Sequence, residues 1–559
     1  MSFRIRNRLI SGLASTLLSA SALGLICTTA AKADSHVGGT LNLLAASAAG
    51  TIDPQVNYTA EFWQLFVITN DGLVTFAKTS GPKSNQIVPD LAVAIPQAQD
   101  NGLTYVFQLR RGIKFSNGQD VTPDDVVATF QRLFKVSSPN ASSWYNVIVG
   151  SDACLKNPAS CTLAGGVVAD DKNYTITFHL THPDAEFMDQ LAVPFAYILP
   201  ANTPAKDLGT KPAPATGPYM ITSYDPQKGL VLERNPYFKE WSKDAQPAGY
   251  VDKISYKFGV SPEDAVTEIE NGQADWMFDA APTDRLAQMA TQYPAQIHIS
   301  PMMEIYYAPM NVNIPPFNNL DARLAVNYAF NRDAAVNIYG GPHLATPNCQ
   351  ILPPGMPGYK AYCPYTMNPD TKWTAPDMAK AEALMKASGQ IGQPVTVITD
   401  DQNVDPALGT YLTSVLNQLG FKATLKVLSA DIQFTYIQNT KNKVQISISS
   451  WVQDYPAASD FINVMLSCGS FHPGSDTSIN ISGFCDKAID QQIQQNLVLA
   501  VTNTDAANKQ WAKIDHEITD KAPWVSMFSP HELDFVSTRL GNFTFSQQFH
   551  LLFSQVWVQ

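Results

Sequence analysis

Asn101-Gly-Leu-Thr-Tyr-Val-Phe-Gln-Leu-Arg-Arg-Gly-Ile-Lys-Phe-Ser-Asn-Gly-Gln-Asp-Val-Thr-Pro-Asp-Asp-Val126 contains, in order, the signals of a strand, a tight turn and a helix. Apolar side chains at 105, 107 and 109 alternate with other residues, as in a strand with one buried face. Asn117-Gly118 predicts a tight turn. Thr122-Pro123-Asp124-Asp125 predicts a helix start, with a hydroxyl cap, a proline in the first turn and two acids facing the helix dipole.

The first 33 residues have the pattern of a secretory signal peptide. Three arginines are followed by an apolar run through 13–26 and by Ala31-Lys32-Ala33 as a small-x-small cleavage site near Ala33. Cys27 follows the bulky Ile26, which does not suit lipoprotein processing. No later segment approaches the roughly 20 uninterrupted apolar residues of a membrane helix. We therefore expect an exported, soluble chain that begins near Asp34, in the periplasm or another extracytoplasmic space.

Charge and length restrict the class of protein. Loss of residues 1–33 removes four basic residues and no acidic one, so the formal net charge changes from −12 to −16. A surface of this sign disfavours nucleic acid and anionic membranes as partners. The remaining 526 residues are too many for one hydrophobic core, which predicts two or three domains. We expect a monomer that binds no nucleic acid.

Six cysteines follow the predicted cleavage site, an even number that favours disulfides in an exported chain. Their spacing favours the local pairs 154–161, 349–363 and 468–485, although six cysteines allow fifteen connectivities. None forms a CxxC pair, and none has a histidine at metal-ligand spacing. We interpret them as structural cross-links of loops.

The second half of the chain alternates between helical and strand patterns. Residues 395–399, 424–427 and 444–450 read as strands, and 408–419 reads as a helix between the first two. An earlier pair of strands, 216–224 and 230–238, surrounds a turn at Gly229. This alternation predicts an α/β fold with a sheet covered by helices.

Five blocks resemble, in the right order, those of the large solute-binding proteins of ABC importers, the peptide/nickel-binding family. They lie at 101–126, 216–238, 268–275, 311–333 and 522–528. The resemblance implies a two-lobed periplasmic-binding-protein fold, type II-like, with an extra domain in the first lobe. It implies a first lobe of residues 34–60, 190–285 and 520–559, an additional α+β domain of 61–189, and a second lobe of 286–519.

The strand at 444–450 is followed by Trp451-Val-Gln-Asp454-Tyr455. An indole beside a carboxylate suits a cationic group, because the ring supplies apolar area and a π face while the carboxylate supplies charge. In peptide-binding relatives the similar motif WxxDY uses its aspartate to bind the α-ammonium group of the ligand. The resemblance therefore implies that Asp454 is the anchor, Trp451 a wall of the site and Tyr455 its neighbour. Alternatively, Asp454 stabilises a turn before Pro456.

Three further aromatic residues are candidates for the site. Trp63 follows the opening element of the first lobe, where relatives approach the ligand. Trp144 and Tyr145 precede the first predicted disulfide loop, where relatives carry aromatic residues that face the cleft. The alternative for each of the three is packing in a core or a loop.

The sequence carries no GxSxG, HExxH, phosphate-loop or GxGxxG motif, so we predict neither catalysis nor a cofactor. We expect the substrate-binding subunit of an ABC importer, which captures short peptides by hinge closure and delivers them to a permease and ATPase complex. One alternative is the same fold with a different solute: an oligosaccharide, an opine or a nickel chelate. An exported hydrolase and a chaperone-like or adhesive protein are further alternatives.

Overall fold

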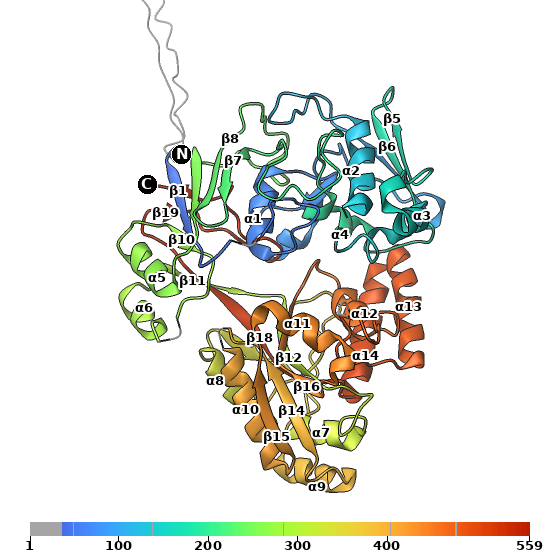
Figure 1. The fold of residues 1–559 in the computed structure, drawn as a ribbon, viewed down its shortest axis with the longest axis vertical. Helices are drawn as coiled ribbons and strands as arrows, with labels where there is room; N and C mark the ends of the chain where they lie inside the picture. The colour runs from blue at the N-terminus through green and yellow to red at the C-terminus, as the bar shows by residue number, and fades with distance from the viewer. Residues whose placement is uncertain (1–35, 49, 137, 283, 403, 476–477) are drawn as a thin grey trace, which may run out of the picture.

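The computed structural model describes residues 36–559 except 49, 137, 283, 403 and 476–477, and it divides into two lobes (Figure 1). The predicted signal peptide, residues 1–33, lies outside the described residues. The first lobe holds the N-terminal half and the C-terminal tail, and the second lobe holds most of the rest (Figure 1). The predicted α/β class and the two-lobed fold are confirmed.

A five-stranded sheet in the order β10-β1-β9-β8-β7 forms the base of the first lobe. Its strands are β1 (Thr40–Leu44), β7 (Tyr219–Asp225), β8 (Gly229–Arg234), β9 (Lys253–Lys257) and β10 (Trp276–Met277). β1 runs parallel to β9 and β10, while β7, β8 and β9 form an antiparallel meander. Helices α5 (Pro262–Glu270) and α6 (Leu286–Gln292) contribute to a small core against β1 and β10.

The predicted additional domain, residues 61–189, falls in the segment that follows β1. This segment contains α1 (Ala60–Thr69), β2 (Val74–Phe76), β3 (Ile87–Pro89), β4 (Thr104–Gln108), α2 (Pro123–Lys135), α3 (Ser151–Lys156), β5 (Val167–Asp170), β6 (Thr175–His179) and α4 (Phe187–Leu191). β4, β6 and β5 form one antiparallel sheet. Buried side chains of this segment and of the first-lobe sheet, such as Phe107 and Leu41, belong to one continuous core. This segment therefore shares its core with the first-lobe sheet.

The predicted start of α2 is confirmed. The backbone N–H of Thr122 donates to Asp125 Oδ2 at 2.7 Å, and the Thr122 hydroxyl donates to the same oxygen at 2.8 Å. The turn before it closes through a bond from the N–H of Gly118 to Phe115 O at 2.8 Å. Gly118 has φ of +86°, which few other residues adopt without strain.

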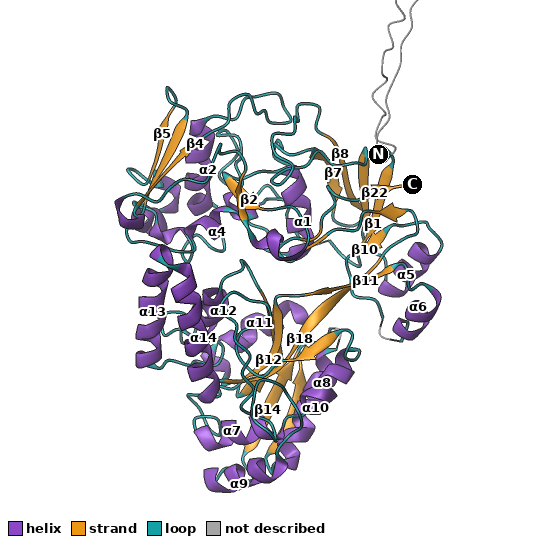
Figure 2. Cartoon of the chain, turned by 180° about the vertical axis from the view of Figure 1, so that it is seen from behind, coloured by secondary structure: helices purple, strands orange, loops and turns teal. Residues whose placement is uncertain are grey.

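The second lobe contains a parallel sheet in the order β15-β14-β16. Its strands are β14 (Pro394–Thr399), β15 (Lys422–Val427) and β16 (Ile446–Ser447). The helices of this lobe are α7 (Leu320–Ala329), α8 (Arg332–Tyr339), α9 (Met378–Ser388), α10 (Asp405–Gln418), α11 (Ala430–Gln438), α12 (Ala458–Leu466), α13 (Lys487–Thr502) and α14 (Thr504–Asp520). α12, α13 and α14 pack on one another at one side of the lobe (Figure 2).

A second sheet, in the order β11-β18-β12-β17, connects the lobes. Its strands are β11 (Ile297–Pro301), β12 (Glu304–Pro309), β17 (Ser449–Val452) and β18 (Trp524–Phe535), and β13 (Ala345–Pro347) also pairs with β18. β11 leaves the first lobe, and the antiparallel strand β18 returns to it (Figures 1 and 2). These two crossings form the hinge that the two-lobed interpretation requires.

The crossings lie near the predicted lobe boundaries at 285/286 and 519/520. Met289 of α6 packs with Leu44 of β1, so the chain leaves the first lobe at β11. Trp524 packs in the core beneath α12 and α14, so the return crossing is β18 itself. After β18, the short pairs β19 (Leu540–Gly541) with β22 (Trp557–Val558) and β20 (Phe545–Ser546) with β21 (His550–Leu551) bring the tail against the first lobe.

The three predicted disulfides are confirmed. Cys154 bonds to Cys161, Cys349 to Cys363, and Cys468 to Cys485. Each closes a loop of fewer than twenty residues within one lobe, as the local spacing predicts.

Candidate ligand-binding site

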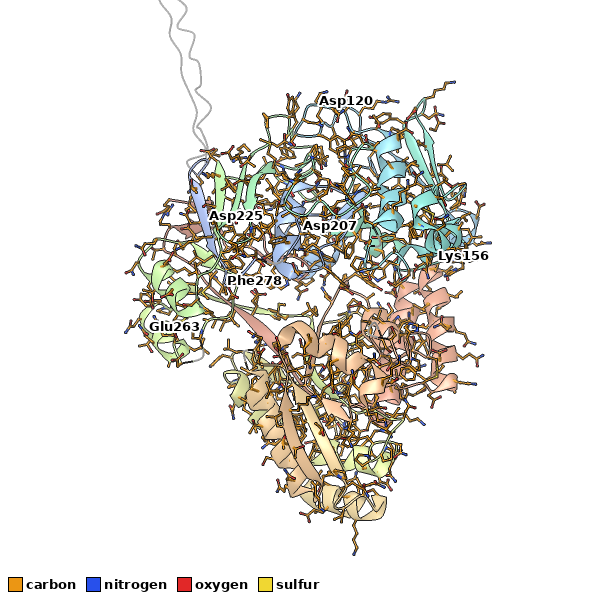
Figure 3. The ribbon with its side chains drawn as sticks, viewed as in Figure 1. Asp120, Lys156, Asp207, Asp225, Glu263 and Phe278 are labelled. Atoms are coloured by element: carbon orange, nitrogen blue, oxygen red, sulfur yellow. A yellow bond between two sulfur atoms is a disulfide. The ribbon has the colours of Figure 1, made fainter. Side chains whose placement is uncertain are left out.

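A cavity of about 740 Å³ lies between the lobes, beside the two crossing strands. Its first-lobe wall comes from α5, from residues 277–282, 284 and 286, and from Ala60. Its second-lobe wall comes from β12, α8 and Val452, and residues 531–534 of β18 close it on the hinge side. Figure 3 shows Phe278 at the lower edge of the first lobe and Glu263 on the helix beside it; both line the cavity. The volume falls in the range of sites for small solutes.

Asp454 lies where the two lobes meet, just after β17. The hydroxyl of Tyr58, from the first lobe, donates to Asp454 Oδ1 at 2.5 Å. Gln548, from the C-terminal tail, donates through its side-chain amide to the backbone oxygen of Asp454 at 2.7 Å. Val452 and Ala60, each two residues from this contact, line the cavity. Asp454 therefore joins the lobes two residues after Val452 of the cavity lining, while its own side chain is not part of that lining.

A second carboxylate, Asp460 of α12, is hydrogen-bonded to the backbone of Asp454 and to Trp451. The backbone N–H of Asp454 donates to Asp460 Oδ2 at 3.0 Å. The indole N–H of Trp451 donates to the same oxygen at 3.4 Å. Because successive residues of a strand point to opposite faces, Trp451 packs toward the core beneath β17 while Val452 lines the cavity. The structure thus places Trp451 behind Asp454, where it orients Asp460.

Tyr455 approaches a third carboxylate. Its hydroxyl donates to Glu186 Oε2 at 2.6 Å, a contact between the second lobe and the additional domain. One oxygen of Glu186 and one of Asp460 are buried with no hydrogen-bond partner. Within the described residues, no lysine or arginine forms an ion pair with Asp454, Asp460 or Glu186. The three carboxyl groups are therefore gathered without a basic partner.

Burial of these three carboxyl groups raises their pKa values. Burial raises the pKa of Asp454 to about 7. Burial, followed by the neighbouring charge of Asp454, raises the pKa of Asp460 well above its ordinary value. Burial also raises the pKa of Glu186 to about 7, with a further contribution from Asp184. A cation placed at Asp454 would stabilise the ionised form of all three groups.

Aromatic rings surround this cluster of carboxyl groups. The rings of Tyr58, Trp63, Trp144 and Phe195 lie near one another, with centroid distances of 5.7 Å for Tyr58–Trp63, 5.2 Å for Tyr58–Phe195 and 5.7 Å for Trp144–Phe195. Tyr455 meets Trp144 edge to face at 5.7 Å. Tyr58 is 42% exposed, whereas Trp63 and Trp144 are buried. The structure brings Trp63, Trp144 and Tyr455 together near Asp454, and Tyr58 is the ring that remains accessible.

Tyr145 occupies a different place. Its ring is fully buried, its hydroxyl donates to the backbone oxygen of Gln190 at 2.8 Å, and it packs against Phe130 at 5.8 Å. The structure thus places it in the core of the additional domain, the alternative that the sequence left open.

Sequence reasoning missed Tyr58 and the acidic wall of the cavity. Tyr58 immediately precedes the N-cap residue Thr59 of α1, which gives it no distinctive signal, and its partner lies 396 positions away. The carboxylates that line the cavity come from α5, from Asp279 and Asp284, and from β12 and β18. The composition shows that the chain is acidic. It cannot show that these carboxylates face the same cavity.

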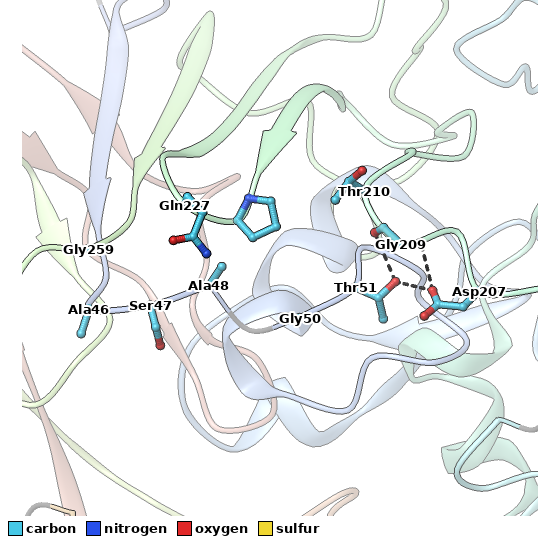
Figure 4. A pocket seen from close by; sticks show the side chains of 11 residues that line it. Ala46, Ser47, Ala48, Gly50, Thr51, Asp207, Gly209, Thr210, Gln227 and Gly259 are labelled. Atoms are coloured by element: carbon cyan, nitrogen blue, oxygen red, sulfur yellow. Dashed lines mark hydrogen bonds between the residues drawn. The ribbon is translucent and has the colours of Figure 1, made fainter. Parts of the chain in front are cut away.

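Another cavity, of about 500 Å³, lies on the first lobe alone (Figure 4). Its lining comes from residues between 46 and 51, the 207–210 loop, Pro226, Gln227 and Gly259. The Thr51 hydroxyl and the N–H of Gly209 donate to Asp207 Oδ1 at 2.5 Å and 2.9 Å. Since no second-lobe residue contributes, hinge closure cannot enclose a ligand there, and the cavity between the lobes is the better candidate.

The described residues hold neither a candidate membrane span nor a candidate metal-binding cluster. No helix among them has the length and apolarity to cross a membrane. In the same residues, no group of three histidine, cysteine, aspartate or glutamate side chains is arranged to hold a metal ion.

Comparison with curated proteins finds relatives of about one-quarter identity over most of the chain. The probable ABC transporter periplasmic-binding protein SapA of Escherichia coli is 26% identical and covers 74% of each chain. The glutathione-binding protein GsiB of Salmonella paratyphi A is 25% identical and covers 77% of this chain and 78% of its own. The dipeptide-binding protein of Escherichia coli is 26% identical and covers 74% and 75%.

Solved structures share the fold over nearly the whole chain. The clavulanic acid biosynthesis oligopeptide binding protein 2 superposes with a TM-score of 0.85 at 21% identity and covers 94% of this chain and 96% of its own. The periplasmic binding protein DppA of Helicobacter pylori, solved with a peptide, gives a TM-score of 0.74 at 19% identity and covers 94% and 98%. The family model described as bacterial extracellular solute-binding proteins, family 5, middle, matches residues 86–473, more than half of the chain. The chain therefore belongs to the family 5 bacterial extracellular solute-binding proteins.

Proposed function

We propose that this chain is the substrate-binding subunit of an ABC importer and that it captures short peptides between its two lobes. The observation that carries the proposal is Asp454, whose carboxyl group accepts a hydrogen bond from Tyr58 of the other lobe and follows Val452 of the cavity lining by two residues. The relatives named as a dipeptide-binding protein, a glutathione-binding protein and a binding protein of an ABC transporter support it.

In this mechanism the hinge at β11 and β18 closes the lobes on the peptide. The α-ammonium group of the peptide replaces the Tyr58 hydroxyl at Asp454, where Asp460 adds a second negative group. Such a contact is strong because neither carboxyl has a basic partner in the protein. Trp63, Trp144 and Tyr455 form the wall behind the anchor, and Trp451 holds Asp460 in place.

The cellular setting follows from the same proposal. Residues 1–33 are a signal peptide cleaved near Ala33, and the mature monomer is located in the periplasm, as its relatives are. Closure around the peptide creates the surface that the permease and its ATPase recognise. The chain makes and breaks no covalent bond, needs no cofactor and binds no nucleic acid.

A thermal-shift panel tests this function. We expect di-, tri- and tetrapeptides to raise the melting temperature, because a ligand at about 100 times its dissociation constant stabilises a protein by about 2.7 kcal/mol. N-acetylated forms of the same peptides lack the ammonium group and should give a much smaller shift. A shift with oligosaccharides, opines or nickel chelates, and none with peptides, would refute the peptide proposal in favour of the alternative solute.

A further inference from the structure

The cavity between the lobes is lined by carboxylates from both lobes and from the crossing strand β18. Its lining includes six acidic residues and, among the described residues, no lysine or arginine. The acidic residues are Glu263, Asp279, Asp284, Glu304, Glu532 and Asp534. The wall therefore has a marked excess of negative charge at a place where a bound solute would be enclosed.

Two of these carboxylates have basic partners. Glu263 pairs with Arg285 at 2.9 Å, and Glu532 pairs with His550 at 2.6 Å. Glu304 and Asp534 form no ion pair within the described part of the chain. Asp279 and Asp284 form none either, so four of the six carboxylates lack an ion-pair partner among the described residues, and two of these four, Glu304 and Asp534, lie where β12 and β18 meet the cavity.

Asp534 supplies a buried carboxylate oxygen at the cavity wall to which a ligand donor can bond. Its side chain is 3% exposed, and its Oδ1 accepts a bond from the indole N–H of Trp276 at 2.7 Å. Its Oδ2 has no hydrogen-bond partner. A buried carboxylate oxygen without a partner is costly, because the group has lost its water without gaining a donor. A cationic donor that enters the cavity would satisfy it.

The remaining walls suit a long cationic side chain. Phe278, Tyr306 and Tyr339 line the cavity, and the two tyrosine rings meet edge to face at 5.5 Å. Aromatic faces attract a guanidinium or ammonium group. Ile338 and Leu344 supply apolar surface for the methylene stem that precedes such a group.

The position of Glu304 relative to Asp454 determines which residue of a bound peptide must carry the positive charge. Val452 lines the cavity two residues before Asp454, which is about 7 Å along an extended strand. Glu304 pairs directly with Val452 in the sheet. A peptide held at Asp454 by its ammonium group and extended along β17 brings the side chain of its second or third residue to Glu304.

We propose that the carboxylates of Glu304 and Asp534 bind the lysine or arginine side chain of the captured peptide, so that the protein prefers peptides with a basic residue at position two or three. This inference rests on the proposed peptide-binding function and adds the substrate class to it.

The raised pKa values of Glu304 and Asp534 agree with their lack of an ion-pair partner. Burial raises the pKa of Glu304 to about 7, with a smaller contribution from the charge of Glu532. Burial, with the same neighbour, raises the pKa of Asp534 to about 8. His550 acts in the opposite direction on both groups but is already paired with Glu532. A ligand cation would supply the missing positive charge.

Titration calorimetry with a matched set of peptides tests the inference. The set is Ala-Ala-Ala, Ala-Lys-Ala, Ala-Ala-Arg and Ala-Glu-Ala, with agmatine as a guanidinium compound that is not a peptide. We expect the basic peptides to bind at least tenfold more tightly than Ala-Ala-Ala, and Ala-Glu-Ala more weakly. In Glu304→Gln the preference should fall to threefold or less, whereas Glu382→Gln, an exposed site on α9, should keep it.

The outcomes separate this inference from the function on which it rests. Equal binding of all four peptides, within threefold, overturns the basic preference and leaves the peptide receptor intact. Binding of agmatine without any peptide, weakened by Glu304→Gln, supports the cation site and overturns peptide capture. Absence of binding by both the basic peptides and agmatine overturns both. A tenfold preference that survives Glu304→Gln shows that the cation binds elsewhere and overturns the assignment.

Discussion

At the scale of single residues, the site is defined by carboxyl groups held without a basic partner. Asp454 accepts a hydrogen bond from Tyr58 and is supported through its backbone by Asp460. A turn-stabilising aspartate, the alternative that the sequence allowed, would be expected to bond mainly to nearby backbone N–H groups. The side chain of Asp454 instead contacts the opposite lobe, which favours the anchor.

Asp454→Asn keeps the shape of this side chain and removes its charge. We expect it to weaken peptide binding at least 30-fold, because loss of one partner from a buried charge pair costs about 2–5 kcal/mol. Calorimetry with Ala-Ala-Ala measures the effect, and Glu382→Gln serves as the matched loss of an exposed carboxylate. Unchanged affinity in Asp454→Asn would show that the ammonium anchor is wrong.

At the scale of elements, α2 carries a buried charge that fixes the additional domain to the first lobe. Arg132 donates from both terminal nitrogens to Asp53, at 3.1 Å and 2.5 Å, and the two side chains are 4% and 0% exposed. It also donates to the backbone oxygens of Pro204 and Lys206. One guanidinium thus joins the helix to two loops of the first lobe.

Arg132→Met should lower the free energy of unfolding by about 3–5 kcal/mol, because it leaves Asp53 buried without its partner. The exposed pair of Lys114 with Asp120 provides the comparison, since its side chains are 39% and 58% exposed. Lys114→Met should cost less than about 1 kcal/mol. Urea denaturation of both variants measures the difference, and equal effects would contradict the structural role of Arg132.

At the scale of the whole molecule, buried acidic groups of the cavity and of the contact between the lobes couple the stability of the folded protein to pH. Burial raises the pKa of Asp454, Glu304 and Glu186 to about 7 and that of Asp534 to about 8. In the unfolded chain the same groups titrate near 4. The folded state therefore binds more protons between these values.

The sign of the pH dependence follows. The contribution of these groups to stability is complete below about pH 4 and is lost as the pH rises through 7 to 8. The melting temperature of the unliganded protein should therefore fall from pH 5 to pH 8. A basic peptide should restore more stability at pH 8 than at pH 5, because it pairs with ionised carboxylates. Thermal-shift curves at four pH values check this, and a peptide effect that decreases with pH would contradict it.

The sequence by itself determined what depends on neighbours along the chain. Three local predictions are confirmed: the alternation of buried and exposed side chains in β4, the turn at Gly118 and the cap of α2. Each depends only on residues within one turn or one strand. The disulfides are confirmed for the same reason, since each closes a short loop. The order of the blocks was enough to identify the family.

Only the tertiary structure decided how the site is assembled. Tyr58 and Asp454 are separated by 396 positions, and the hinge alone brings them together. The register of β17 against β12 turns Trp451 toward the core and places Val452 and Glu304 in the cavity. Tyr145 lies in a core for a similar reason, because packing rather than sequence order sets its direction. The sequence determines which charged residues the chain contains. The arrangement of the two lobes determines which of these residues line the same cavity.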